Sequence, residues 1–224
     1  MKKFFSLLFI SILTIAAFAD GYTIRNKNEV NSFDQIFMTK YSKTQDYIST
    51  GLEITGLVFP AVCLMAPKED WLEIGVTYAE TMAVAFGLRC LFKSTEQRAR
   101  PYLYCEGAPQ KEIDKGDAYK SFMSGHSIMT FAAAGFTTFT FLRYCSDSEW
   151  TAPVIAATWT IALATATLRI TSGCHFMSDV LSGAAVGTAV GFLIPLMNSL
   201  WFEPALKNSP IELKGNGVAL KFKW

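Results

Sequence analysis

Five long apolar segments, separated by polar links, constrain the fold of this chain more than any other feature. They comprise residues 51–66, 71–92, 125–145, 150–168 and 179–201. Each is too long for a strand and lacks period-two alternation, so each predicts a helix. Hydrophobic residues make up 51% of the 224 residues and charged residues only 17%. We therefore expect an all-α, polytopic membrane helix bundle, with one domain over residues 51–201.

The first 19 residues have the pattern of an export signal. Lys2 and Lys3 precede the apolar stretch Phe4–Phe18, and Ala17 and Ala19 have the spacing of a cleavage site. The alternative is an uncleaved first membrane helix, although the stretch falls short of the ~20 residues that a spanning helix needs. In both cases the chain that follows starts outside the cytoplasm.

Residues 20–50 form a polar segment between this signal and the bundle. Phe33, Ile36, Phe37 and Tyr41 lie near helical spacing in it. The pattern predicts either an amphipathic helix on the periplasmic membrane surface or a short helix that covers the bundle.

A C-terminal tail, residues 202–224, follows the last apolar segment. Alternating residues after Gly217 indicate a half-buried strand. The preferred interpretation is an interfacial tail that Phe222 and Trp224 anchor.

Acidic and small residues inside the apolar segments give two further predictions. Glu80 lies within residues 71–92, and we expect it to face the bundle interior and bond a Thr or Tyr. Gly183, Gly187 and Gly191 recur every four residues, which favours close approach of another helix.

Three polar blocks next to the apolar segments carry the candidate chemistry. They are Lys93-x6-Arg100-Pro101, Ser124-Gly125-His126 and Arg169-x5-His175-x3-Asp179. On a helix, the spacing of His175 and Asp179 places both side chains on one face, and a carboxylate beside an imidazole fixes its tautomer. Arg169 offers a planar cation suited to phosphate. The blocks therefore indicate a phosphate site.

Together the blocks resemble the signature of the type 2 phosphatidic acid phosphatase (PAP2) superfamily, KxxxxxxRP, PSGH and SRxxxxxHxxxD. The likeness covers residues 93–180 and keeps order, spacing and residue type. Met123 replaces the proline of the second block, and Leu168 replaces the serine of the third. The second replacement removes a hydroxyl that could donate to phosphate.

The resemblance implies a role for each matching residue. His175 would be the nucleophile, Asp179 its orienting partner, and His126 the acid that protonates the leaving group and then the base that activates water. The implied phosphate-binding residues are Lys93, Arg100, Ser124, Gly125 and Arg169. The scheme needs no metal and no cofactor, because cations of the protein neutralise the phosphate. Arg98 lies among the same cations, and we expect it only to anchor lipid headgroups.

Counting the apolar segments gives a topology. If the chain starts outside, the polar link 93–124 and the residues around 169–178 both return to the outer face. Lysines and arginines such as Lys68 and Arg143 then fall inside, as the positive-inside rule requires. We expect a multi-pass protein of the bacterial cytoplasmic membrane with its site facing the periplasm. Cys105 and Cys174 could form a disulfide in that oxidising compartment.

The leading functional hypothesis is a lipid phosphatase. Its substrate would be phosphatidate, phosphatidylglycerophosphate, undecaprenyl pyrophosphate or the lipid A 1-phosphate. The alternatives are a soluble periplasmic acid phosphatase acting on small esters, and a non-catalytic membrane scaffold with a decayed site. The net charge of +1 gives no case for nucleic acid, and no obligatory protein partner is evident.

Overall fold

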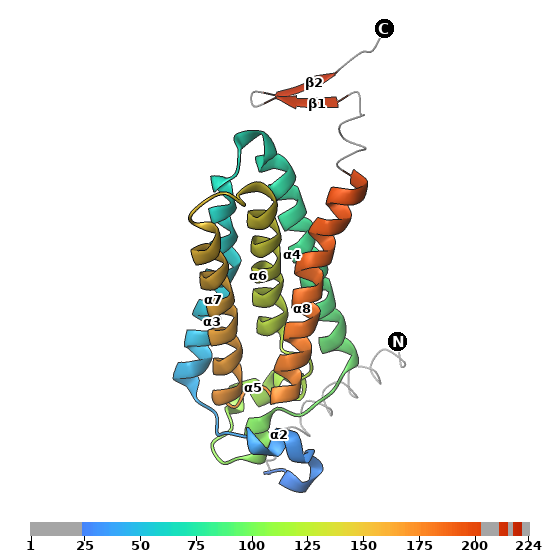
Figure 1. The fold of residues 1–224 in the computed structure, drawn as a ribbon. Helices are drawn as coiled ribbons and strands as arrows, with labels where there is room; N and C mark the ends of the chain where they lie inside the picture. The colour runs from blue at the N-terminus through green and yellow to red at the C-terminus, as the bar shows by residue number, and fades with distance from the viewer. Residues whose placement is uncertain (1–23, 203–210, 215–216, 221–224) are drawn as a thin grey trace, which may run out of the picture.

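The computed structural model describes residues 24–202 and the strands at 211–214 and 217–220. The expected export signal and the aromatic end of the tail lie outside the described residues. The described chain is a bundle of long helices, as expected (Figure 1). They are α3 (Lys43–Val58), α4 (Trp71–Thr95), α6 (Gly125–Tyr144), α7 (Thr151–Thr171) and α8 (Met177–Met197).

Shorter elements connect and cover these helices. The short α-helices are α2 (Ser32–Ile36) and α5 (Gln110–Asp114). Single 3₁₀ turns or segments occupy Lys27–Glu29, Phe59–Met65, Lys68–Asp70, Pro101–Tyr104 and Asp117–Tyr119, and Asn198–Phe202 is a π-helical turn. The tail strands β1 (Ile211–Lys214) and β2 (Gly217–Leu220) pair antiparallel, Lys214 opposite Gly217. The tail therefore contains a two-stranded hairpin where the sequence indicated one strand.

Helix α6 is the centre of the bundle. It packs against α3, α4, α7 and α8, and most of its residues are buried (Figure 1). Among the described residues, four helical stretches are long and apolar enough to cross a membrane: 43–65, 68–95, 151–171 and 177–200. Helix α6 is not among these four stretches. The hydroxyls of its Thr137 and Thr138 donate hydrogen bonds to the backbone carbonyls of Ala133 and Ala134, at 2.8 Å each.

The glycine face of α8 explains its close contact with α6. A Cβ on Gly187 would lie 2.3 Å from the carbonyl oxygen of Ile128, and one on Gly191 would lie 2.4 Å from that of Ala132. A Cβ on Gly183 would lie 2.7 Å from the Ser124 oxygen. Only residues without a Cβ allow this approach, so the predicted small-residue contact is present.

The first long helix begins earlier than the sequence suggested. It starts at Lys43 instead of residue 51 and takes in polar residues that we assigned to the preceding segment. Polarity there does not end the helix, because buried partners accept the polar side chains. Asp46 pairs with Arg169 and accepts a hydrogen bond from the Tyr41 hydroxyl at 2.9 Å. Pro60 stands at the start of the 3₁₀ segment, where its missing N–H costs little.

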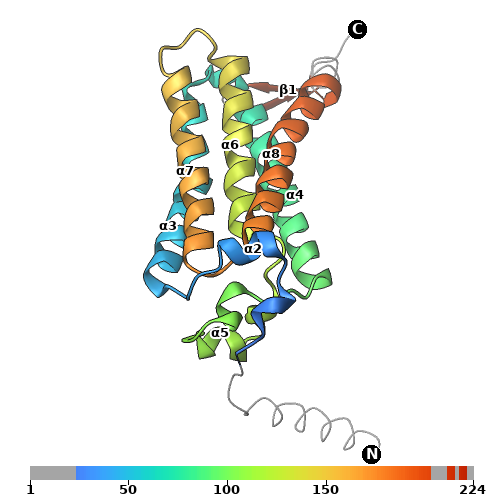
Figure 2. The same cartoon turned by 60° about the horizontal axis from the view of Figure 1, so that its bottom comes forward.

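The N-terminal segment covers one end of the bundle, where α2 and α5 lie near the first residues of α3, α6 and α8 (Figure 1, Figure 2). Asn31 caps α2 by accepting from the Asp34 N–H at 2.9 Å. Asp34 is buried, whereas Phe33 and Ile36 remain exposed. The contacts of α2 with the bundle are therefore polar, and the position of the segment relative to a membrane surface stays a prediction.

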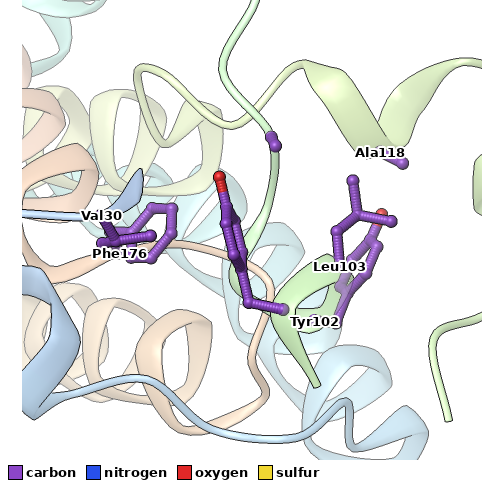
Figure 3. Packing of buried hydrophobic residues seen from close by; sticks show 7 residues of the cluster. Val30, Tyr102, Leu103, Ala118 and Phe176 are labelled. Atoms are coloured by element: carbon purple, nitrogen blue, oxygen red, sulfur yellow. The ribbon is translucent and has the colours of Figure 1, made fainter. Parts of the chain in front are cut away.

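A small hydrophobic cluster joins the covering segments to the bundle. Its buried members are Val30, Ala99, Tyr102, Leu103, Tyr104, Ala118 and Phe176. Figure 3 shows Val30 against Phe176, with Tyr102, Leu103 and Ala118 beside them. The cluster unites the N-terminal segment, the 96–124 link and the turn before α8, and so it joins the first and third motif blocks.

Glu80 does not have the expected surroundings. It is exposed on the surface of the described bundle, and its carboxylate accepts from the Asn198 amide at 2.5 Å. The same amide contacts the Thr77 hydroxyl at 3.2 Å. The expected threonine is thus bridged to Glu80 by Asn198, because α4 and the end of α8 lie side by side there.

Candidate active site

A cavity of about 270 Å³ lies at the covered end of the bundle. Five of the eight predicted site residues line it: Lys93, Arg100, His126, Arg169 and His175. Its other lining residues are Tyr41, Asp46, Arg89, Tyr102, Glu112, Asp117 and Cys174. The structure therefore brings both histidines of the chain together with four cations.

The position of His126 is set by the start of α6. Ser124 is the N-cap of this helix, and its hydroxyl oxygen accepts hydrogen bonds from the N–H and the hydroxyl of Ser127 at 3.4 and 2.9 Å. Such a cap satisfies an N–H that the helix leaves without a partner. His126 is then the second residue of α6 and enters the cavity wall.

The position of His175 is set by the turn between α7 and α8. Gly173 has φ +72°, and a Cβ there would lie 2.6 Å from the Thr39 carbonyl oxygen. The Gly173 carbonyl accepts from the Tyr102 N–H at 3.2 Å, and the His175 N–H donates to the Arg169 carbonyl at 3.1 Å. These contacts fold the turn tightly, and they leave His175 only 1% exposed.

Asp179 lies beside His175 but does not hydrogen-bond it in this structure. The His175 Nδ1 is 3.8 Å from the Asp179 Oδ2 and has no hydrogen-bond partner. The Asp179 carboxylate instead accepts from the Ser121 hydroxyl at 2.6 Å, the Phe176 N–H at 3.0 Å and the Arg98 guanidinium at 2.5 Å. Asp179 therefore closes the first turn of α8 while remaining near the imidazole.

Arg98 corrects a sequence-based expectation. Its guanidinium bridges Asp34 at 2.7 Å and Asp179 at 2.5 Å, and it lies 4.4 Å from the centre of the Phe176 ring. It also donates to the Ser178 hydroxyl at 2.8 Å. Arg98 thus joins the N-terminal segment to the site by ion pairs, a structural role beyond that of a headgroup anchor.

Ser124 and Gly125 do not line the cavity, although both were expected to bind phosphate. Ser124 is fully buried and serves as the cap. Gly125 makes room for Arg89, because a Cβ on Gly125 would lie 2.6 Å from the Arg89 Nε. Ser124 therefore fixes the start of α6, and Gly125 leaves the space that Arg89 occupies beside it.

The cavity arginines are paired with acidic groups, whereas the cavity lysine donates to a carbonyl. Arg100 donates to the Asp117 carboxylate at 2.5 Å and to the Asp117 carbonyl at 3.0 Å. Arg169 pairs with Asp46 and donates to the Ser49 hydroxyl at 3.0 Å, while its Nε has no partner. The Lys93 ammonium donates to the Lys120 carbonyl at 3.3 Å. These contacts hold the three cations at the wall of the same cavity and leave N–H donors of the cations for an anionic ligand.

Arg89 and Glu53 are site residues that the sequence analysis missed. Glu53, on α3, bridges the Arg89 Nη1 at 2.9 Å and the His126 Nε2 at 3.1 Å. Two signals were available. Arg89 stands four residues before Lys93, and hence on the same helix face, and Glu53 is an ionisable residue in an apolar segment.

The surroundings of His175 favour its neutral form. Burial lowers its pKa well below 6.5, and the nearby charges of Arg100, Arg169 and Lys93 lower the pKa further. A neutral imidazole has a free lone pair, which a nucleophile requires.

Cys174 is buried next to His175, and burial raises the pKa of its thiol. Cys105 and Cys174 are both thiols in this structure, so the disulfide that the sequence allowed is not formed.

Comparison with known proteins identifies the family. The model of the PAP2 superfamily matches residues 74–202. The chain belongs to this superfamily. A lipid A 1-phosphatase of Porphyromonas gingivalis is 33% identical over 152 residues, which are 67% of this chain and 30% of that protein. This chain thus spans less than a third of that relative.

A solved structure shares the fold. The crystal structure of a transmembrane PAP2-type phosphatidylglycerolphosphate phosphatase from Bacillus subtilis superposes with a TM-score of 0.55. The likeness covers 90% of this chain and 98% of that one, at 19% identity. The likeness shows a shared fold, and four of the described helical stretches here are long and apolar enough to cross a membrane, which agrees with the expected multi-pass arrangement.

Proposed function

We propose that this protein is a lipid phosphatase that releases phosphate from a lipid phosphomonoester or pyrophosphate through a phosphohistidine on His175. One observation carries the proposal: both histidines of the chain line a single cavity with Arg89, Lys93, Arg100 and Arg169. Phosphate esters resist attack because their oxygens are negative, and a ring of cations removes that obstacle.

The geometry supports a two-step reaction. The cations hold the phosphate, and a ring nitrogen of His175 forms a bond to phosphorus. The bond from phosphorus to the lipid oxygen breaks, and that oxygen leaves with the electron pair and takes a proton from His126. Water then gives a proton to His126 and attacks phosphorus, the bond to His175 breaks, and inorganic phosphate departs.

A groove beside the cavity favours a lipid substrate over a small ester. It has a volume of about 1110 Å³, lies between α4 and the α5 region, and shares Arg89, Lys93 and Asp117 with the cavity. Phe86, Ile113 and Tyr119 give it apolar surface, and Lys115 and Lys120 add cations. Such a groove suits an acyl chain with an anionic headgroup at its end.

The comparisons and the groove together support the proposed substrate class. The relatives are named for lipid A 1-phosphate and phosphatidylglycerophosphate, which are both lipid phosphomonoesters. We extend this class to phosphatidate and to undecaprenyl pyrophosphate, which present the same terminal phosphate. The site would face the periplasm from the cytoplasmic membrane.

A phosphate-release panel tests the proposal. The purified protein in detergent receives the four lipids and a short soluble ester, with and without a metal chelator. We expect release from at least one lipid, unaffected by chelation, inhibited by vanadate and abolished in His175→Ala. Release from the soluble ester alone would favour the acid phosphatase, no release from any compound would favour the scaffold, and full activity of His175→Ala would refute the nucleophile.

A further inference from the structure

Glu53 is a buried carboxylate for which the reaction scheme above has no role. It belongs to α3 and is 7% exposed, and both of its oxygens are engaged. Oε1 lies 2.9 Å from the Arg89 Nη1, and Oε2 lies 3.1 Å from the His126 Nε2. The Thr50 hydroxyl, one turn earlier on α3, lies 3.3 Å from the same ring nitrogen. Two groups of α3 thus hold one nitrogen of His126.

We propose that Glu53 is the positioning residue of the leaving-group acid. It holds His126 by Nε2, so that Nδ1 is the nitrogen which faces the cavity and delivers the proton. This inference rests on the proposed function, because it assigns a partner to the residue that protonates the leaving oxygen.

The arrangement solves an electrostatic problem of the site. His126 must carry a proton when the lipid oxygen leaves, yet Arg89, Arg100 and Arg169 surround it together with His175. A cation among cations is disfavoured in a low-dielectric site. A carboxylate in contact with the imidazole opposes this and stabilises the imidazolium, as in other histidine and acid pairs.

Arg89 fixes the carboxylate in place. It donates to Oε1, and Oε2 then lies toward the imidazole. The close approach of Arg89 to the start of α6 requires Gly125, since a Cβ there would lie 2.6 Å from Nε and 2.9 Å from Cδ of Arg89. The glycine of the Ser-Gly-His block is therefore needed in this chain to leave room for the Arg89 side chain.

The test compares leaving groups. For Glu53→Gln, we measure kcat/KM with an alkyl phosphomonoester, whose alkoxide needs a proton to leave, and with 4-nitrophenyl phosphate, whose phenolate does not. General acid catalysis contributes roughly 10²–10⁴-fold. We expect the alkyl ester to lose about 10²-fold or more, and the aryl ester to lose less than about 10-fold. His126→Gln should show the same selectivity, and the double variant should lose little more than either single one.

Glu73→Gln is the matched control. Glu73 is also a helix glutamate that accepts a hydrogen bond, here from the Tyr144 hydroxyl at 2.9 Å. It lies at the start of α4, whereas the cavity residue Lys93 lies at the end of that helix. Its substitution should leave the ratio of the two substrates unchanged. If Glu53→Gln does not fold, Glu53→Asp retains the charge at a longer distance and should show a smaller loss in the same direction.

The outcomes separate this inference from the proposed function. Equal losses on both esters in a folded Glu53 variant, with an active wild type, would overturn the role of Glu53 and leave the phosphatase intact. An inactive wild type on every phosphate ester would overturn the phosphatase itself.

Discussion

At the scale of single residues, the site combines four cations from three parts of the chain around two imidazoles. Arg89 and Lys93 come from α4, Arg100 from the following link, and Arg169 from α7. Each arginine has a carboxylate partner, whereas Lys93 donates to a carbonyl. A phosphate can then replace carboxylate contacts with contacts of its own, which is less costly than placing unpaired cations in the bundle.

Titration of His175 tests the effect of these cations. Burial and the surrounding charges lower its pKa well below 6.5, so the imidazole should stay neutral until the pH falls far below that value. The chain has two histidines, and His126→Gln leaves His175 as the only one. We therefore expect ¹⁵N imidazole resonances of this variant, purified without a histidine tag, to remain those of the neutral ring at pH 6. A midpoint at or above 6.5 would contradict the structure.

Arg98 gives a second prediction at this scale. Arg98→Gln removes the cation between Asp34 and Asp179, both fully buried. Breaking a buried pair costs about 3–5 kcal/mol, and we expect about 1–3 kcal/mol here because Arg98 is partly exposed. The measurements are the melting temperature in detergent and amide exchange of residues 24–42, which should accelerate.

Arg25→Gln is the control for Arg98, because Arg25 pairs with Glu29 on the surface. It should change neither quantity measurably. If Arg98→Gln behaves in the same way, then Arg98 acts only as a headgroup anchor, as the sequence alone suggested.

At the scale of elements, the contact of α6 with α8 organises the bundle. It places the start of both helices, and hence His126 and Asp179, at the same level. The Ser124 N–H donates to the Asp179 carbonyl at 3.1 Å across this contact. The glycine face of α8 therefore positions side chains of the proposed site one or more turns away.

Alanine at Gly187 tests the contact. The new Cβ would lie 2.3 Å from the Ile128 carbonyl oxygen, and backbone cannot yield as a flexible side chain does. Overpacking of this kind costs about 1–3 kcal/mol, so we expect a lower melting temperature and reduced phosphate release. Gly75→Ala in α4, where no atom lies within 4 Å of the new Cβ, should not lower the melting temperature. Equal effects of both substitutions would refute the role of the glycine face.

At the scale of the whole molecule, the long helices alternate in direction, and all three motif blocks meet at one end (Figure 1). The tight links after Met65 and Tyr144 lie at the other end. The arrangement agrees with the parity argument from the sequence, which needs the blocks on one side.

Cysteine labelling identifies that side. In a background with Cys90, Cys105 and Cys145 replaced by serine, Lys115→Cys lies in the α5 region, and Ser148→Cys lies in the opposite link. We expect a membrane-impermeant maleimide, applied outside a cell whose outer membrane is permeabilised, to label the first and spare the second. The reverse pattern would place the site in the cytoplasm.

The sequence by itself determined the helical class, the five long helices of the described part of the chain, and five residues of the proposed site. Apolar length and motif spacing are local properties, and Lys93, Arg100, His126, Arg169 and His175 were all found from them. The small-residue face of α8 was also readable, because its period matches a helix turn.

Only the tertiary structure decided which groups meet across helices. The partners of His126 and Asp179 come from α3 and the 96–124 link, far away in sequence, so no spacing rule connects Glu53 to His126 or Arg98 to Asp179. It also decided that the polar first turns of α3 are helical, because Asp46 finds Arg169 in the folded bundle. Charged groups inside a membrane protein depend on such partners, and partners are a property of the fold.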